Sequence, residues 1–213
     1  MTLKQNQPFR FILQFSLLLL ALTLFWLQPA PALALSNTPA LPAFADFAKS
    51  VENGQKDVLR GVYVENVLAF PIVQQPTNSD GYVSSHDGEI TQFNIVAKYG
   101  NVGLLAHNHL AGNVFSQLAV GQEVKLIYGD GHTEIFVVQE ILQYQALQPT
   151  SPYSNFKNLN KDETLTAQQM FQRVYLGDHH VTFQTCIKSN GEASWGRLFI
   201  IATPKVMGNW RSQ

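Results

Sequence analysis

The chain has 213 residues, of which 46% are hydrophobic and 14% are charged. This length suits one domain with short attachments, and this balance of residues supports a packed core rather than a disordered chain. The formal net charge is −1 and lysine and arginine form no cluster, so the composition argues against nucleic acid as a partner.

Residues 1–34 have the pattern of an export signal. Lys4 and Arg10 supply positive charge at the start of an apolar run over residues 11–27. Residues 32–34 (Ala-Leu-Ala) have the small-x-small form of a cleavage site, which favours a cleaved signal peptide. The alternative is a retained membrane anchor, since the run lies at the short end of the roughly 17–25 residues that span a bilayer. Either alternative predicts an exported, extracytoplasmic protein of the cell envelope or membrane.

Residues 35–57 read as a linker with a short helix. The first part, residues 36–47, is rich in proline and alanine, and the mixed pattern of residues 49–60 indicates the helix. The pattern then becomes β, because residues 59–73 alternate β-branched and aromatic side chains. Residues 74–89 carry proline, asparagine and glycine and are predicted to form a turn-rich loop.

Residues 90–98 and 102–107 are the next predicted strands. Asn113 is a candidate cap of a short helical turn, and Gly121 ends this turn. The clearest hairpin is EVKLIYGDGHTEIFVV, because its central Asp-Gly pair tolerates the left-handed backbone angles of a tight turn.

Residues 164–175 form the best predicted helix. Apolar residues at i, i+3, i+4 and i+7, starting from Ala167, make one stripe that is typical of core packing. Thr166 and Gln169 fit a capping box at its start, and Gly177 suits its end.

Two final strands are predicted at residues 180–187 and 197–203, joined by the polar loop SNGEAS. Many closely spaced strands with one late helix indicate a mostly β domain, either a mainly antiparallel barrel or a sandwich. We therefore expect one such domain over residues 58–206, with residues 207–213 as a C-terminal tail.

Cys186 is the only cysteine. In an exported protein, an unpaired cysteine indicates a free reactive thiol, an intermolecular disulfide or a buried inert residue. A free thiol titrates at about 8.5 and is mostly protonated at neutral pH, so a reactive one needs a base nearby. The candidates are the six histidines: His86, His107, His109, His132, His179 and His180.

His107 and Arg197 have the most suggestive positions relative to Cys186. His107 follows the apolar run VGLLA at the point where a strand opens into a loop. Arg197 opens the strand RLFIIA one tight loop after Cys186, so antiparallel pairing would bring the two together. A guanidinium that keeps its proton suits an oxyanion or a substrate carbonyl. The ordinary alternatives are an edge histidine and a surface arginine.

Four segments occur in a suggestive order: LLAHNH, FSQLAVGQEV, VTFQTC and GRLFIIA. Together they resemble the sortases, exported cysteine transpeptidases with an eight-stranded β-barrel, over about residues 58–204. Three positions depart from the family pattern. Ala106 stands where many sortases have glycine, Phe183 stands where leucine is usual, and His109 adds a second imidazole close to His107.

The resemblance implies acyl transfer without a cofactor or metal. It assigns Cys186 as the nucleophile, His107 as the acid and base, and Arg197 as the stabilising cation. The implied substrate is an exported protein or peptide with a sorting motif, and the implied acceptor is an amine of the cell envelope, or water.

The resemblance also suggests residues that contact the substrate. Thr185 matches the threonine that precedes the family's cysteine. The segment of residues 148–178 lies where sortases vary their substrate groove. We therefore expect Met170, Phe171 or Tyr175 to influence specificity, although core packing is an alternative role for each.

Two other functions fit the same residues. One is a non-catalytic, exported β-barrel that binds a surface partner and keeps the sortase fold. The other is a metal site at His107 and His109, completed by His179 or Cys186, since zinc needs three or four converging ligands.

Overall fold

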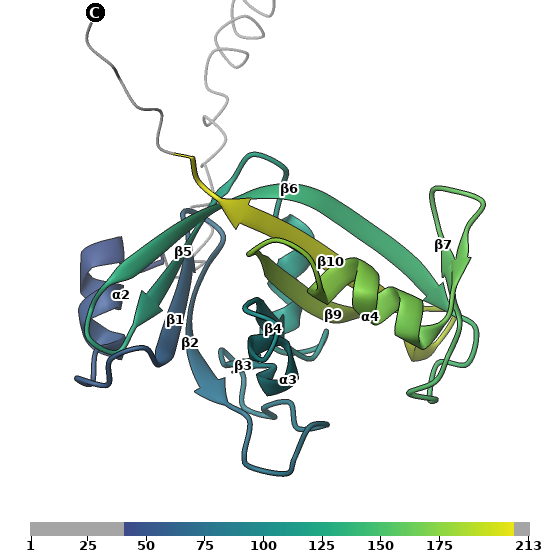
Figure 1. Ribbon diagram of the computed structural model, residues 1–213, viewed down its shortest axis with the longest axis horizontal. Helices are drawn as coiled ribbons and strands as arrows, with labels where there is room; N and C mark the ends of the chain where they lie inside the picture. The colour runs from purple at the N-terminus through teal and green to yellow at the C-terminus, as the bar shows by residue number, and fades with distance from the viewer. Residues whose placement is uncertain (1–40, 207–213) are drawn as a thin grey trace, which may run out of the picture. The chain divides into compact units, whose positions relative to one another are not determined.

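The computed structural model describes residues 41–206 (Figure 1). The predicted signal segment, the linker as far as residue 40 and the C-terminal tail lie outside the described residues. Among the helices of residues 41–206, none has both the length and the apolar character needed to cross a membrane.

The described residues form ten strands and four helices. The helices are α2 (Phe44–Val51), α3 (Asn94–Ala97), the 3₁₀ helix η1 (Ala111–Gln117) and α4 (Ala167–Tyr175). The strands are β1 (Leu59–Val64), β2 (Leu68–Gln74), β3 (Ile90–Gln92), β4 (Val102–Leu105), β5 (Glu123–Tyr128), β6 (Thr133–Ala146), β7 (Phe156–Asn158), β8 (Thr164–Leu165), β9 (Val181–Ser189) and β10 (Glu192–Pro204).

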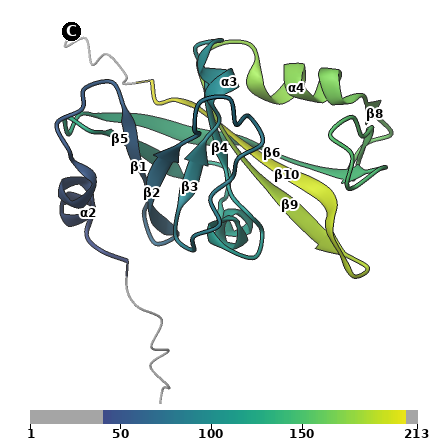
Figure 2. The same ribbon diagram turned by 90° about the horizontal axis from the view of Figure 1, so that it is seen from below.

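Eight of these strands close into a barrel. Their order is β6-β10-β9-β4-β3-β2-β1-β5 and back to β6, while β7 and β8 extend the sheet beyond β6. The β2–β3 and β4–β9 pairs are parallel and the other pairs are antiparallel. The expected fold class, a mostly β protein with an eight-stranded barrel, is confirmed. The long antiparallel pair of β9 and β10 is clearest in Figure 2.

β10 is a strand whose two faces are both buried. Leu198, Ile200 and Ala202 pack inside the barrel, whereas Phe199 and Ile201 belong to an outer cluster. This alternation follows the two-residue period of a strand. Each large apolar side chain that is buried stabilises the fold by roughly 1.5–3 kcal/mol.

α4 covers the outer face of the barrel wall beside β9 and β10 (Figure 1). Its predicted capping box is confirmed, since Thr166 and Gln169 exchange side-chain-to-backbone hydrogen bonds. The helix is shorter than predicted, because Thr164 and Leu165 pair with β7 as β8. Thr182 in β9 donates to the carbonyl of Val174 at 2.5 Å, so this helix is also tied to the sheet by a buried polar contact.

Two segments differ from the sequence prediction. The strand expected at residues 90–98 ends at Gln92, and α3 follows. Asn94 donates to the backbone and side chain of Gln75, which turns the chain and buries Val96 against the outer cluster. The N-terminal helix lies at Phe44–Val51, earlier than the pattern of residues 49–60 suggested, because Phe47 packs on Tyr63 in the sheet.

Other boundaries shift for local reasons. η1 begins at Ala111 rather than at a cap on Asn113, because the carbonyl of His107 already accepts from the amides of Leu110 and Gly112. β9 and β10 extend further than predicted toward each other. The turn between them is tight, since Asn190 and Gly191 adopt positive φ angles of 50° and 81°.

Candidate active site

β9 lies at the centre of the candidate site, between β10 and β4. Cys186 pairs directly with Arg197 of β10. On the other side, Gln184 pairs with Leu105 of β4, and continuing this parallel register by two residues brings His107 beside Cys186. Directly opposed residues of neighbouring strands face the same side of a sheet. Register therefore places the thiol and the guanidinium on one face, and the amide of Ala106, which donates to the carbonyl of Gln184, leads the chain on to His107 beside them.

These three side chains line one cavity of about 170 Å³. It opens on the outer face of the barrel wall, because Gln184 and Cys186 alternate with the inward-facing Phe183. The Cys186 thiol is half-buried and has no disulfide partner. The full lining is Val83, Leu105, Ala106, His107, Gln184, Thr185, Cys186 and Arg197.

The loop that carries His107 is held tightly against β9. The buried hydroxyl of Thr185 donates to the carbonyl of Ala106 at 2.9 Å, which fixes the end of β4. The amides of Leu110 and Gly112 both donate to the carbonyl of His107 at 3.0 Å. Because its hydroxyl proton is engaged in this way, Thr185 positions the loop in addition to lining the cavity.

Arg197 is half-buried and is held by backbone carbonyls rather than by a carboxylate. Nη1 donates to the carbonyls of Ser194 and Gly196 at 2.9 Å each, and Nη2 lies 3.4 Å from the carbonyl of Pro149. Among residues 41–206 no acidic side chain forms an ion pair with it. Its positive charge is therefore oriented but not neutralised, and it remains available to an anion formed beside Cys186.

His107 differs from the other five histidines, all of which lie in the described part of the chain. His109 is exposed next to it, with the ring centroids 5.4 Å apart, and does not line the cavity. His132 bonds to Asp130, and this hydrogen bond lowers the pKa of that carboxyl. The remaining three contact groups away from Cys186: His86 lies near Glu89, His179 bonds to Gly100, and His180 bonds to Asp178 and Val174.

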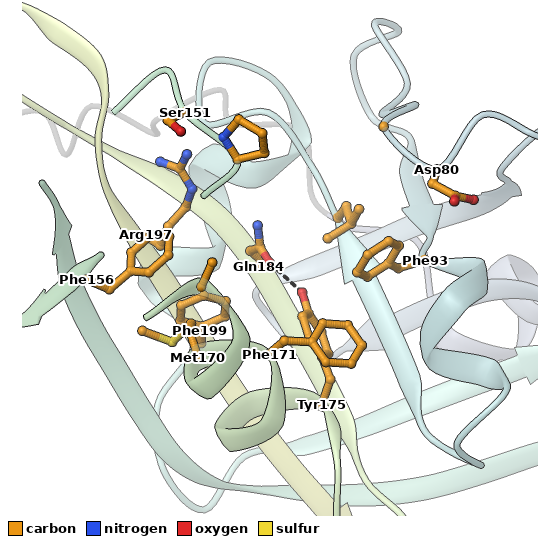
Figure 3. A pocket seen from close by; sticks show the side chains of 14 residues that line it. Asp80, Phe93, Ser151, Phe156, Met170, Phe171, Tyr175, Gln184, Arg197 and Phe199 are labelled. Carbon is orange, nitrogen blue, oxygen red and sulfur yellow. Dashed lines mark hydrogen bonds between the residues drawn. The ribbon is translucent and has the colours of Figure 1, made fainter. Parts of the chain in front are cut away.

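A larger, mainly apolar cavity of about 320 Å³ adjoins the first (Figure 3). It shares Leu105, Gln184 and Arg197 with the smaller cavity. Phe171 and Tyr175 of α4 both line it and also pack in the outer cluster, so these two residues serve the core and the cavity together. The remaining residues of its lining are Asp80, Gly81, Phe93, Ser151, Pro152, Phe156, Ala167, Met170 and Phe199.

Sequence patterns missed several residues of this lining. Phe93 and Phe199 join α4 there only because distant strands meet in the barrel wall. Gln184 could have been found, since it lies two residues before Cys186 on the same face of one strand.

A third cavity, of about 250 Å³, also borders Cys186. It shares Thr185 and Cys186 with the first, and polar groups make up a larger part of its lining than of the first cavity's. Those polar residues are Asn108, Asn113, Ser116 and Gln143, and Lys188 supplies the charge. Cys186 is therefore bordered by cavities of different chemistry.

The alternative metal site can be examined at the same place. Within residues 41–206, no three histidine, cysteine, aspartate or glutamate side chains converge in an arrangement that would hold a metal ion. His107 and His109 have neighbouring rings, but His179 bonds to the carbonyl of Gly100 instead of joining them.

No family model matches the sequence, and no curated protein matches it. Solved structures do match. Sortase A from Listeria monocytogenes is 12% identical, with a TM-score of 0.46 over 70% of this chain and 88% of that chain. A sortase D5 transpeptidase from Clostridium perfringens is 18% identical, with a TM-score of 0.42 over 78% and 90%.

A third similar structure is sortase C from Clostridium perfringens, solved with the C-terminal cell wall sorting motif. It is 13% identical, with a TM-score of 0.45 over 76% of this chain and 83% of that chain. These three similar structures are sortases of types A, D and C.

Proposed function

We propose that the chain is a sortase-type cysteine transpeptidase. The observation that carries the proposal is the row of His107, Cys186 and Arg197, which lie on and beside three adjacent strands and line one cavity. A thiol, a proton-transferring imidazole and an un-neutralised cation are the groups that acyl transfer through a thioester requires.

The first half-reaction forms the acyl-enzyme. The Cys186 thiolate attacks a backbone carbonyl, and a C–S bond forms while the carbonyl oxygen becomes negative. Arg197 stabilises this oxyanion. The C–N bond then breaks, His107 gives its proton to the departing amine, and a thioester remains on Cys186.

The second half-reaction transfers the acyl group to the acceptor and regenerates the free enzyme. An incoming amine attacks the thioester carbonyl and gives a proton to His107, and the C–S bond breaks to regenerate the Cys186 thiolate. Water in place of the amine gives hydrolysis. Cys186 lines two cavities that offer separate approaches. The smaller one, which adjoins the large apolar cavity, suits the acyl donor, and the one with more amide and hydroxyl groups suits the acceptor.

The substrate class follows from the sequence resemblance. We propose an exported protein with a sorting motif as the acyl donor and an amine of the cell envelope as the acceptor. The N-terminal segment would bring the enzyme to the same extracytoplasmic compartment, whether or not it is cleaved.

Intact mass spectrometry tests the reaction class. The purified full-length chain is incubated with a pool of peptides of the form Leu-Pro-x-Thr-Gly and an amine acceptor. Wild type is expected to give an acyl adduct or transfer product, and both disappear in Cys186→Ala. His107→Ala is expected to lose turnover and His109→Ala to retain it. A product that persists in Cys186→Ala would refute the proposal, and no product at all would favour the non-catalytic binding module.

A further inference from the structure

Gln184 lies between the large apolar cavity and the smaller cavity that contains the thiol. It lies in β9 two residues before Cys186, and its side chain faces the same side of the sheet. Together with Leu105 and Arg197, it lines both the large apolar cavity and the smaller cavity that contains the thiol. Any extended chain that passes from one cavity to the other therefore runs beside its amide.

Tyr175 fixes the orientation of this amide. The tyrosine hydroxyl donates to Oε1 of Gln184. Burial raises the pKa of Tyr175 above its ordinary value, so the hydroxyl keeps its proton and remains a donor. The ring packs against Phe93 and Phe171 at centroid distances of 5.5 and 5.3 Å, which limits its movement.

The opposite end of the amide is available to a ligand. Nε2 points away from Tyr175 (Figure 3), and no acceptor within residues 41–206 bonds to it. Gln184 is half-buried, so this donor faces the cavity rather than the core. Apart from Arg197, the Tyr175 hydroxyl, Asp80 and Ser151, the other side chains that line the large cavity are apolar, which makes the amide a directional feature in a mainly apolar groove.

The spacing along β9 identifies a partner for Nε2. Residues i and i+2 of an extended chain lie about 6.6 Å apart and direct their carbonyls to the same side. A peptide that runs extended and parallel to β9, with its reacting carbonyl at Cys186, therefore presents the carbonyl two residues earlier to Gln184. The preceding side chain would then reach the aromatic part of the large cavity.

We propose that Gln184 is a specificity-determining residue, whose Nε2 donates to the backbone carbonyl two residues before the scissile one. This inference rests on the proposed function and adds a named contact to it. The contact selects an extended donor peptide with an apolar residue next to it upstream, and Tyr175 acts through Gln184 as a positioning residue.

Binding to an inactive protein tests the contact without any chemistry. The full-length chain carrying Cys186→Ala is titrated with fluorescein-labelled pentapeptides z-Pro-Ala-Thr-Gly, where z is Leu, Phe or Asp. Fluorescence polarisation gives each Kd. A second set replaces the amide between Pro and Ala by an ester, which weakens the proline carbonyl as an acceptor.

The Leu and Phe peptides are expected to bind more tightly than the Asp peptide. Adding Gln184→Leu raises Kd by about threefold to tenfold, the range of one neutral hydrogen bond. The ester raises Kd by a similar factor in Cys186→Ala but not in Cys186→Ala/Gln184→Leu. Tyr175→Phe weakens binding less than Gln184→Leu does, and it adds little to that variant because the two act on one contact.

Controls separate this contact from general damage. Gln172→Leu makes the same chemical change on the exposed side of α4 and is expected to leave Kd and the unfolding temperature unchanged. The inference is overturned if Gln184→Leu leaves Kd unaltered, if the ester costs the same in both backgrounds, or if none of the peptides binds. If instead the proposed function is wrong, wild type shows no Cys186-dependent cleavage, but Gln184-dependent binding persists. The two failures are therefore distinguishable.

Discussion

At the scale of single residues, the orientation and charge of the Arg197 guanidinium lead to the clearest prediction. Three backbone carbonyls orient its guanidinium, yet no carboxylate of residues 41–206 neutralises it. A preorganised, un-neutralised cation stabilises a developing oxyanion without having to reorganise during the reaction. Lysine at the same position would keep the charge but lose the planar fork that the carbonyls hold.

We therefore predict that Arg197→Lys lowers kcat/KM by about 10²–10³-fold, the usual cost of losing one oxyanion donor. Steady-state cleavage of the best peptide checks this, together with thermal unfolding to show that the fold is intact. Arg173→Lys is the matched control, because Arg173 is exposed on α4 and pairs with Glu140. Equal losses in both variants would contradict a specific role for Arg197.

Gly112 is the second residue whose environment predicts an effect. A Cβ there would lie 2.7 Å from the carbonyl oxygen of His107 and 2.8 Å from that of Ala106, and closer still to the Thr185 hydroxyl. Two of these contacts are backbone atoms that cannot rotate away, so the loop with His107 must move.

Gly112→Ala is predicted to destabilise the protein by about 1–3 kcal/mol, as overpacking usually does, and to lower kcat more than it raises KM. Urea unfolding and cleavage kinetics measure the two effects. Gly81→Ala serves as the stability control, since a Cβ at Gly81 meets nothing within 4 Å. Unchanged kinetics in Gly112→Ala would show that the loop tolerates the shift.

At the scale of elements, α4 links the outer core to the large cavity. Phe171 and Tyr175 belong to both, so the stability of this helix and the shape of the cavity depend on each other. The helix is only nine residues long, which makes its N-terminal capping box a large part of its local stability.

Thr166→Ala is predicted to lower the free energy of unfolding by about 1 kcal/mol, because it leaves the amide of Gln169 without its side-chain acceptor. Chemical denaturation measures this cost, and hydrogen exchange should show faster opening of α4 than of the barrel strands. Thr164→Ala, at an exposed position two residues earlier, should have little effect. A similar loss in both variants would argue against the cap.

At the scale of the whole described domain, closure of the barrel depends on a continuous interior. Phe183 is fully buried there and meets Phe115 of η1 edge to face, with centroids 5.2 Å apart. This contact gives the Phe183 ring an aromatic partner inside the barrel, which a leucine at the same position would lack.

Phe183→Ala is predicted to lower the free energy of unfolding by about 3–5 kcal/mol, because it leaves a cavity in the barrel interior. A double-mutant cycle of Phe183→Leu with Phe115→Leu should give a coupling of about 0.5–1.5 kcal/mol. Tyr153→Leu is the surface control, since Tyr153 is 85% exposed. Zero coupling would show that the two rings contribute independently.

Local patterns predicted much of the fold because they act within a few residues. Alternating side chains indicated the strands, the Asp-Gly turn located the β5–β6 hairpin, and Thr166 with Gln169 located the start of α4. The patterns failed at Asn94–Ala97 and missed β7, because these short elements depend on distant partners. Propensity over three or four residues is too weak to outweigh such contacts.

The candidate site also has a part that the sequence predicts and a part that depends on the fold. From sequence alone, Cys186 and Arg197 could be expected to meet, since one tight hairpin joins their strands. The position of His107 beside Cys186 depends on the parallel pairing of β4 with β9, whose partners lie nearly 80 residues apart, from Val102–Val181 to Leu105–Gln184. The catalytic roles of these residues stay predictions.

The sequence by itself determined the class of the domain, its helix cap and the identity of its single thiol, because residue type and short-range spacing carry that information. Only the tertiary structure decided the closure between β6 and β10, the choice of His107 over His109 as the cavity histidine, and the fixed amide of Gln184. Strand register and packing set these features, and both arise from contacts between residues that the chain brings together only when it folds.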